Sequence, residues 1–433
     1  MNNFTRNTLI TFITKCLYLL TGVGITVFIA RTLGVEGKGI YSLAVLLPTL
    51  LVVFANLGIG SASVYFTAKN KYPIKEIISS NIILSGIVSL FVLMLGLIIV
   101  FFFSDLFFPG VSQKYLLLSL VLFPFQIFIN YLVNVLLGLH RVKKYNLINL
   151  ASIFIFFLLL LLLSQYGLIT VIISQILGLF FSCLLLFFWL RKEAGGLVFK
   201  INKSYLKDAF SYGFKTYLGN IFSFSFLRID VFLINIFIFP LAVGLYSASV
   251  SIAESIWLIS QSASTVLFPK ITSEKDNQKI KNFTPLVCRN ILFITFLMAV
   301  LLFFSAKWVV VTLFGTDFLG SVLPLQILLI GSIAISVSRI LAFDFYGRGM
   351  PILSSYTNFF AIIVNVLLNI FWIPKYGIAG AAWATSVSYS FAFLVNLVSY
   401  LRISGNKIGE ILLVKKSDFR FYRNFINLFK RNV

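Results

Sequence analysis

The chain has 433 residues, of which 60% are hydrophobic and only 11% are charged, and its mean hydropathy is +1.01. Soluble domains carry about 25% charged residues, so 13 acidic and 35 basic side chains are too few to cover a soluble protein of this length. A soluble enzyme, a coiled coil and a disordered chain are therefore excluded as descriptions of the whole sequence.

Apolar segments long enough to cross a bilayer recur along the whole chain. A transmembrane helix needs roughly 20 apolar residues, and charges, prolines and glycines divide this sequence into twelve such segments. The runs are continuously apolar, which predicts helices rather than a β-barrel, because a helix satisfies its own backbone groups in lipid. The predicted spans lie near residues 9–31, 40–66, 77–103, 115–139, 146–164, 168–190, 209–238, 242–268, 286–306, 321–346, 352–373 and 377–401.

The charges between the spans predict the orientation in the membrane. When the N-terminus is counted as loop zero, the even-numbered loops and the C-terminal tail hold most of the bases, for example Arg141, Lys143 and Lys144. Cytoplasmic loops are the basic ones, so both termini are predicted to be cytoplasmic. This distribution accounts for most of the net charge of +22 without any nucleic acid. The opposite side carries only Arg31, Lys38, Lys114, Lys307 and Lys375.

The sequence contains no motif for catalysis. Cys16, Cys183 and Cys288 lie in or beside apolar runs without metal-ligand spacing, and His140 is the only histidine. A catalytic metal needs a cluster of such ligands, and an ATP-driven pump needs a glycine-rich phosphate loop with its lysine. We therefore predict that the protein is not an enzyme and has no metal or organic cofactor.

The two halves of the sequence repeat each other in the same order and at a nearly constant spacing. Six spans per half is an even number, so both halves enter the membrane from the same side and form parallel repeats. We predict an all-α membrane protein with twelve transmembrane helices in two six-helix bundles around a central cavity. The matches are GIYS at 39–42 with GLYS at 244–247, LFPFQI at 122–127 with VLPLQI at 322–327, YGL at 166–168 with YGI at 376–378, and FITK at 12–15 with YGFK at 212–215.

The predicted organisation has four parts. They are an N-terminal six-helix bundle at 1–191, a cytoplasmic linker at 192–208, a C-terminal six-helix bundle at 209–402 and a basic amphipathic cytoplasmic tail at 403–433. In the tail, Tyr422, Phe425, Ile426 and Phe429 share one helical face, and the neighbouring bases suit anionic lipid. A solvated membrane anchor and a partner-binding segment are the two interpretations of this tail.

Seven charged side chains lie inside apolar segments, where one charge costs roughly 2.5–3.5 kcal/mol at the bilayer centre. They are the bases Lys15, Lys215, Arg228 and Arg339 and the acids Asp230, Glu254 and Asp344. In one interpretation, Arg228 pairs with Asp230 or Glu254, and Arg339 pairs with Asp344, to hold helices together. In the other, the bases and Arg31 at the outer mouth form a cationic cavity for an anionic substrate. The acids then balance this charge or bind a coupling proton or sodium ion.

Amide side chains form stripes on two of the predicted helices. Gln126, Asn130 and Asn134 recur every four residues in the fourth span. Asn358, Asn365 and Asn369 lie within about 40° of each other on the eleventh, at ~3.6 residues per turn. Such amides either hydrogen-bond sugar hydroxyls or join helices to each other. Pro124 and Pro324 precede glutamines at equivalent positions of the repeat, which is consistent with a hinge in each half or with a static kink.

Several of these segments carry a family resemblance. The segments ARTLGVEGKGIY at 30–41, NLGIG at 56–60, RID at 228–230 and VGLYS at 243–247 resemble Wzx-type flippases. These are the polysaccharide biosynthesis transporters of the multidrug/oligosaccharidyl-lipid/polysaccharide (MOP) superfamily. The resemblance extends over the twelve spans and their two halves.

The resemblance implies a function and a location. It implies transfer of an undecaprenyl-diphosphate-linked oligosaccharide from the cytoplasmic to the outer face of a bacterial inner membrane, for O-antigen, capsule or another exopolysaccharide. It also implies coupling to an ion gradient, membrane lipids as surroundings and the polysaccharide polymerase as a protein partner. A diphosphate and its sugars do not cross hydrocarbon unaided, because burying charge is prohibitive. A cavity with arginine and lysine would neutralise the diphosphate.

Three alternatives remain open at this point. A multidrug cation antiporter has the same superfamily fold but favours an acidic cavity, which the bases argue against. A lipid II flippase handles similar chemistry but typically has two more spans. A membrane scaffold for the polymerase and glycosyltransferases would not need charges inside its spans.

Overall fold

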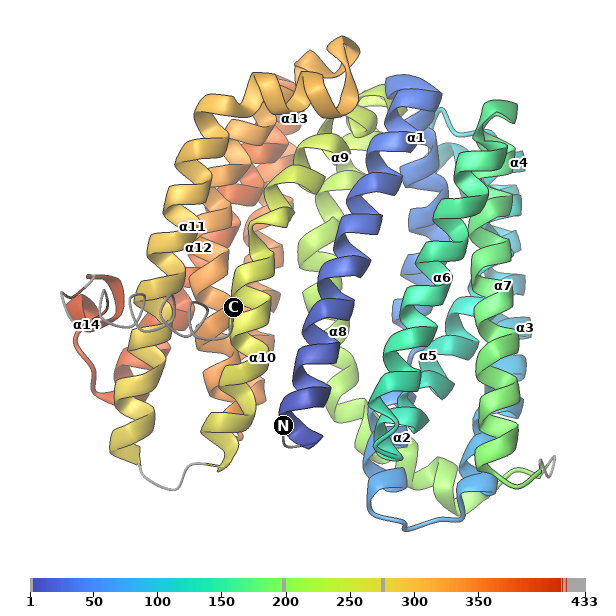
Figure 1. Cartoon of the computed structure of the whole chain (residues 1–433). Helices are drawn as coiled ribbons and strands as arrows, with labels where there is room; N and C mark the ends of the chain where they lie inside the picture. The colour runs from blue at the N-terminus through green and yellow to red at the C-terminus, as the bar shows by residue number, and fades with distance from the viewer. Residues whose placement is uncertain (1–2, 197–199, 274–276, 414, 416–417, 419–433) are drawn as a thin grey trace, which may run out of the picture. The chain divides into compact units, whose positions relative to one another are not determined.

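The computed structural model describes residues 3–196, 200–273, 277–413, 415 and 418, and all the regular elements in these residues are helices (Figure 1). The predicted amphipathic face of the tail, from Tyr422 to Phe429, lies outside the described residues. The chain divides into two compact units. Unit 1 comprises 1–248 with 313–318, and unit 2 comprises 249–312 with 319–433.

Unit 1 contains the first eight helices and the beginning of α9. They are α1 (Asn3–Ala55), α2 (Ile59–Ala68), α3 (Ile74–Phe107), α4 (Gln113–Leu120), α5 (Leu122–Gly138), α6 (Val142–Leu163), η1 (Ser164–Tyr166), α7 (Leu168–Glu193), α8 (Lys203–Ile238) and α9 (Pro240–Ser255). Unit 2 contains most of the rest, namely α10 (Trp257–Ser273), α11 (Asn277–Phe314), η2 (Thr316–Ser321), α12 (Val322–Gly347), α13 (Pro351–Ser404) and α14 (Ile408–Leu412).

Within the described residues, nine helical segments are long and apolar enough to cross a membrane. Eleven of the twelve predicted spans can be followed in them. The segments Ile13–Ala55 and Pro351–Ser404 each contain two predicted spans or the greater part of them, because a glycine with non-helical backbone angles divides each helix. The predicted eighth span is divided between α9 and α10, each of which is shorter than a full span. The all-helical membrane fold predicted from hydropathy is thus confirmed.

Four turns between helices share one unusual backbone conformation. Gly34 has φ 68° and ψ −172°, and Phe239, at the equivalent position of the repeat, has φ 78° and ψ 172°. Gly167 has φ 94° and ψ −171°, and its equivalent Gly377 has φ 59° and ψ −141°. This region of backbone space is essentially restricted to glycine. The repeat found in the sequence therefore extends to the geometry of the turns.

The second and eighth predicted spans, 40–66 and 242–268, are interrupted rather than continuous. Unit 1 breaks the helix between α1 and α2, where Leu57 has φ 51° and Gly58 has φ 72°. In the second half of the chain, α9 ends at Ser255 and α10 begins at Trp257. Each of these two predicted spans thus consists of parts of two helices, and they are the equivalent spans of the two repeats.

Hydroxyl groups satisfy the backbone at the break in unit 1. A broken helix in the membrane leaves carbonyls without an intrahelical donor, and each must find another partner. The Tyr131 hydroxyl donates to the carbonyl oxygen of Ala55 at 2.6 Å, and the Tyr217 hydroxyl donates to that of Phe54 at 2.5 Å. A Cβ at Gly58 would overlap the carbonyl of Gly213 in α8, so this close contact between backbones requires glycine.

The repeated prolines lie in the first turn of a helix in both halves. Pro124 is the third residue of α5 and follows Val121, which separates α4 from α5 within the fourth predicted span. Pro324 is the third residue of α12 and follows η2. A proline in a first turn removes a backbone donor that has no intrahelical acceptor. Of the two interpretations of these prolines, their place in a first turn favours a static kink. The hinge stays a prediction.

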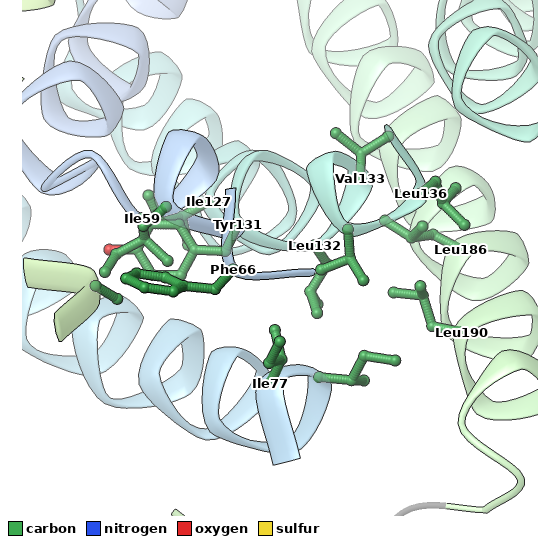
Figure 2. Packing of buried hydrophobic residues seen from close by; sticks show 14 of the residues in the cluster. Ile59, Phe66, Ile77, Ile127, Tyr131, Leu132, Val133, Leu136, Leu186 and Leu190 are labelled. Carbon is green, nitrogen blue, oxygen red and sulfur yellow. The ribbon is translucent and has the colours of Figure 1, made fainter. Parts of the chain in front are cut away.

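Branched and aromatic side chains from several helices of unit 1 form its largest described core cluster. Figure 2 shows Ile59 and Phe66 of α2, Ile77 of α3, Tyr131 of α5 and Leu190 of α7 within it. Tyr205 and Ala209 of α8 are buried in the same cluster. The first turns of α8 are therefore part of the hydrophobic core that the earlier helices build.

Polar contacts fix the beginning of α8 to the loop between α2 and α3. Asp208 accepts hydrogen bonds from Lys71 at 2.5 Å and from the Tyr72 hydroxyl at 2.6 Å. These two donors hold the pKa of Asp208 below its usual range. Asn202 donates to Glu76 at 2.5 Å, and its side-chain oxygen caps α8 by accepting from the backbone N–H of Tyr205. Helix α8 therefore belongs to unit 1. The linker expected at 192–208, between the two six-helix bundles, remains a prediction.

A buried ion pair attaches the end of the described chain to α11 in unit 2. Arg289 donates to both carboxylate oxygens of Asp418, at 2.9 and 2.8 Å, and also to the carbonyl of Glu410 at 2.5 Å. The side chains of Arg289 and Asp418 are 7% and 1% exposed. A bidentate arginine–carboxylate pair is strong and geometrically specific. The start of the basic tail is consequently held on unit 2.

Candidate functional site

The predicted bases of the first span lie on the surface of unit 1. Lys15 and Arg31 are both exposed side chains of α1. Arg31 donates from Nε to the carbonyl oxygen of Leu313 at 2.7 Å, which positions its guanidinium at the end of the first span. The backbone of Lys215 lies in α8, and its side chain is outside the described part of the chain.

Asp230 is a buried carboxylate of α8 that accepts a hydrogen bond from a tyrosine. The Tyr246 hydroxyl donates to Oδ2 at 2.6 Å, and the backbone N–H of Val231 donates to Oδ1 at 2.7 Å. Arg228, on the same helix, is half-buried and donates to the carbonyl of Leu227 at 3.3 Å. Asp230 therefore contacts the tyrosine of the GLYS motif, and spacing along the chain did not predict this contact.

The two copies of the glycine–tyrosine–serine motif contact each other in unit 1. A Cβ at Gly39 would overlap the carbonyl of Pro240, and a Cβ at Gly244 would overlap the carbonyl of Val35. The hydroxyls of Ser42 and Ser247 lie 3.5 Å apart. Equivalent residues of the two copies thus meet as pairs, which is the arrangement expected of parallel repeats. We call these residues, 39–42 and 244–247, the motif seam.

Sequence reasoning missed a buried lysine beside this seam. Lys38 was predicted to lie in an outer loop, but it belongs to α1 and is only 4% exposed. No acidic side chain among the described residues forms a salt bridge with it. The equivalent position of the second copy holds Val243. The sequence signal for this site was therefore a charged residue in one copy of the repeat where the other copy has an apolar residue.

The amide stripe of the fourth predicted span lies along α5. Gln126, Asn130 and Asn134 are all half-buried. Asn134 donates to the carbonyl of Asn130 at 3.0 Å, and Gly60 of α2 lies directly against this pair. The Oε1 of Gln126 is buried without a hydrogen-bond partner among the described residues. Buried polar atoms are normally hydrogen-bonded, so the side-chain oxygen of Gln126 can accept a hydrogen bond from a further donor.

In unit 2, Arg339 of α12 lies over an aromatic ring rather than beside Asp344. Its guanidinium carbon is 4.2 Å from the centre of the Trp257 ring. Trp257 is the first residue of α10, directly after the interruption that follows Glu254, and it is 3% exposed. Glu254 and Arg339 are both half-buried. The structure thus brings Arg339 to the position in unit 2 where the eighth span is broken.

Asp344 is paired with a different arginine from the one expected. Arg348, one turn later in α12, donates from Nε to Oδ1 at 2.5 Å, and the Thr284 hydroxyl donates to Oδ2 at 2.6 Å. Asp344 is fully buried. In one of the two interpretations of these charges Asp344 pairs with Arg339. In the structure it pairs with Arg348 instead, because residues at i and i+4 share a helical face, whereas residues five apart do so poorly.

The amides of the eleventh predicted span form hydrogen bonds within α13. Asn369 donates to the side-chain oxygen of Asn365 at 2.8 Å, and Asn365 donates to the Thr385 hydroxyl at 3.4 Å. Both asparagines are fully buried. Of the two interpretations of this stripe, these contacts favour the one in which the amides join helices.

The candidate charges of the two units differ. Unit 1 contains one buried acid, Asp230, and four described bases, Lys15, Arg31, Lys38 and Arg228. In unit 2, Asp344 pairs with Arg348, and the guanidinium of Arg339 lies over the Trp257 ring. No cluster of His, Cys, Asp and Glu in the described residues has the form of a metal site.

Solved structures with this fold are membrane transporters. The chain has a TM-score of 0.77 to the lipid II flippase MurJ in an inward closed conformation, with 18% identity over 93% of this chain and 89% of that one. It has a TM-score of 0.72 to an inward-facing multidrug resistance MATE family transporter of the MOP superfamily, with 15% identity over 90% and 95% of the two chains. A MOP superfamily transporter from Pyrococcus furiosus gives 0.67 and 15% identity over 93% and 95%. The fold is therefore that of MOP superfamily transporters.

The sequence comparisons narrow this class to a family. Residues 28–323 match the family described as "Polysaccharide biosynthesis protein", and the chain belongs to that family. It is 28% identical over 160 residues to an uncharacterized membrane protein of Methanocaldococcus jannaschii, covering 37% of this chain and 38% of the relative. It is 25% identical over 191 residues to a probable low-salt glycan biosynthesis flippase of Haloferax volcanii, covering 42% and 40%.

These findings confirm the resemblance to a polysaccharide biosynthesis family and show that the chain has the fold of the transporters named above. The chain spans about two fifths of the length of the curated relatives that it matches.

Proposed function

We propose that this protein is a flippase that moves an undecaprenyl-diphosphate-linked oligosaccharide across the cytoplasmic membrane by alternating access. The observation that carries the proposal is the match of residues 28–323 to a polysaccharide biosynthesis family, together with a relative named as a glycan biosynthesis flippase. The glycan would become O-antigen, capsule or another exopolysaccharide, and the polysaccharide polymerase is the proposed partner downstream. The proposed location is the inner membrane of a bacterium, with both termini in the cytoplasm because cytoplasmic loops are the basic ones.

The diphosphate is the part of the substrate that needs the protein most. Its charge is prohibitive to bury without partners, and arginine offers a planar set of donors that fits phosphate oxygens. We assign this role to the bases Lys15, Arg31, Lys215 and Arg228 of unit 1 and Arg339 of unit 2. The prenyl chain remains in lipid throughout, and no covalent bond forms or breaks.

Coupling to a proton or sodium gradient is the proposed source of energy. A coupling acid has to change its partner or its proton during transport. Asp230, Glu254 and Asp344 are the candidates; Asp230 accepts from the Tyr246 hydroxyl, and Asp344 is held by Arg348 and Thr284. For sugar contact we propose Gln126, Asn130, Asn134, Asn365 and Asn369. The side-chain oxygens of Gln126 and Asn369 are both buried without a hydrogen-bond partner among the described residues.

The test is to quantify lipid-linked intermediates and surface glycan in cells that lack this gene. Accumulation of the lipid-linked repeat unit with loss of surface glycan supports the flippase, and its mass identifies both the sugars and the prenyl carrier. Normal glycan with increased sensitivity to cationic drugs would point instead to a multidrug antiporter. Accumulated lipid II would point to a lipid II flippase.

Neutral variants of the bases test the site assignment. Arg228→Gln and Arg339→Gln should each lower surface glycan at least tenfold while the protein stays in the membrane at normal amount. Arg141→Gln is the matched control, because this arginine directly precedes α6 and pairs with Glu193 at the end of α7, away from the assigned residues. Wild-type glycan in both site variants would contradict the cationic assignment.

A further inference from the structure

We infer that the exposed side of the first turns of α8 is a docking surface, on which the diphosphate-headed lipid is captured before it enters the protein. We call this surface the α8 face, and it comprises Lys203, Lys207, Phe210, Phe214 and Leu218. The inference rests on the proposed function, because the occupant is the substrate of that function. All five residues belong to unit 1.

The five side chains of the α8 face share one side of the helix. At ~3.6 residues per turn they lie within about 80° of one another, and all five are exposed. Phe210, Phe214 and Leu218 are 37%, 58% and 44% exposed. The opposite side of the helix carries Tyr205 and Ala209, which are buried in the core cluster of unit 1. The α8 face is therefore turned away from the core.

The charged and apolar parts of the α8 face follow one another along the helix. The two lysines come first, and the three apolar side chains then extend over about 12 Å at ~1.5 Å per residue. The helix continues into Tyr217–Ile238, a segment apolar enough to cross a membrane. The step from Lys207 to Phe210 thus marks the boundary between headgroups and hydrocarbon. A lipid on this face places its headgroup on the lysines and its chain along the apolar side chains.

The two lysines have no acidic partner and lie at the unfavourable end of their helix. Among the described residues, neither amine forms a salt bridge. Asp208, which follows Lys207, bonds instead to Lys71 and to the Tyr72 hydroxyl. Like charges four residues apart repel each other, and a base near the start of a helix opposes the helix dipole. An anion placed over Lys203 and Lys207 removes both penalties.

The number of charges suits a diphosphate better than a singly charged phospholipid. Residues four apart on a helix have Cβ atoms about 5–6 Å apart, so each amine can meet one of two adjacent phosphates. Lysine binds phosphate as a point charge on a flexible stem. Lys71 is attached to this part of α8 through Asp208 and is itself 53% exposed, so it adds positive charge beside the pair. We therefore commit to the diphosphate lipid as the occupant.

The end of α7 provides a control surface, because it lies at the other end of the predicted cytoplasmic linker. Phe188 is 59% exposed there, and the bases Arg191 and Lys192 follow it in the last turn. Bases at this end of a helix favour the dipole, and residues i and i+1 do not face each other. The end of α7 thus has the same kinds of side chain without the arrangement of the α8 face.

Photo-crosslinking of the purified full chain in phosphatidylcholine nanodiscs tests the inference. Benzoyl-phenylalanine replaces Phe214 in one protein and Phe188 in the control, and the probe is undecaprenyl diphosphate at low mole fraction. The yield at position 214 should exceed that at 188 at least fivefold. Lys203→Gln and Lys207→Gln should each lower the yield at 214 about fivefold, the change expected for one cation near a charged lipid surface. Melting temperature is the check on folding.

Two further arms test the charge and the headgroup. Arg191→Gln combined with Lys192→Gln removes two bases from the control surface and should leave the yield at position 214 unchanged. Phosphatidylglycerol, added at the same mole fraction as the probe, should lower this yield less than twofold. Excess unlabelled undecaprenyl diphosphate should abolish it.

Each contrary result has a separate meaning. Equal yields at positions 214 and 188, or a yield at 214 that the lysine variants do not change, would overturn the docking surface. Competition by phosphatidylglycerol as strong as by the diphosphate lipid would overturn it too, since the lysines would then be a general contact with anionic lipid. The flippase proposal fails separately, if cells without the gene keep normal surface glycan and accumulate no lipid-linked repeat unit. Cross-linking as expected would then leave the docking surface standing.

Discussion

The two copies of the motif seam share a backbone arrangement and differ in the groups around it. In the first copy, the Tyr41 hydroxyl donates to the neutral amide of Gln175 at 2.9 Å. In the second, the Tyr246 hydroxyl donates to the carboxylate of Asp230 at 2.6 Å. The first copy also follows the buried Lys38, where the second has Val243.

This difference shows which part of the repeat determines structure and which part is free to carry charge. The glycines are required in both copies, because each one touches backbone beside the other copy. The polar partners are not required to match, so one copy has gained a cation and the other an anion. The seam is symmetric in its packing and asymmetric in its electrostatics.

The largest effect is expected from the glycines of the seam. Gly39→Ala and Gly244→Ala should each destabilise the protein by about 3 kcal/mol or more, because the added methyl overlaps backbone atoms that cannot move independently. Similar losses in the two variants, measured by thermal unfolding in detergent, would support the symmetry of the packing. Gly86→Ala is the matched control, since nothing lies within 4 Å of its Cβ position, and it should change stability little.

A smaller and unequal effect is expected from the tyrosine hydroxyls. Tyr246→Phe should cost about 2 kcal/mol, because it removes a hydrogen bond to a buried charge, whereas Tyr41→Phe should cost about 1 kcal/mol. The same unfolding measurement applies to both. Equal losses would show that Asp230 is not charged in the folded protein. They would contradict the electrostatic asymmetry of the seam.

The turns that precede the seam should respond in opposite directions. Phe239 adopts a conformation that costs a residue other than glycine about 1–3 kcal/mol, so Phe239→Gly should leave stability unchanged or raise it by about 1 kcal/mol. Gly34→Ala should lower stability by about 1–2 kcal/mol, although its Cβ has open space around it. Destabilisation by both changes would show that Phe239 contributes contacts that outweigh its backbone strain.

Hydropathy and the spacing of the repeat were sufficient to predict the spans, because burial in lipid acts on each segment separately. The interruptions at Leu57 and Ile256 could not be predicted this way, since the break in unit 1 depends on hydroxyls that Tyr131 and Tyr217 bring from other helices. Hydropathy also placed Lys38 outside the membrane segments, because a charged residue was read as the end of a span. In the structure Lys38 is buried within α1.

The candidate site was predicted as a set of residue types rather than as a set of contacts. The pair between Asp344 and Arg348 could have been found, because their i,i+4 spacing on one helix is a standard signal. The positions of Arg339 over Trp257 and of Tyr246 on Asp230 had no such signal, since each contact joins two helices. Partners within a helix follow from spacing, but partners between helices need the fold.

The attachment of α8 to the loop between α2 and α3 has a consequence for how the protein is made. Tyr205 and Ala209 complete a core whose other members are synthesised before them. A ribosome adds about 5–20 residues per second, so α2 and α3 remain in the membrane for several seconds with part of this core uncovered. Assembly of unit 1 therefore finishes only when the start of α8 has been synthesised. A chain cut at Gly196 would release a fragment that cannot complete its own core.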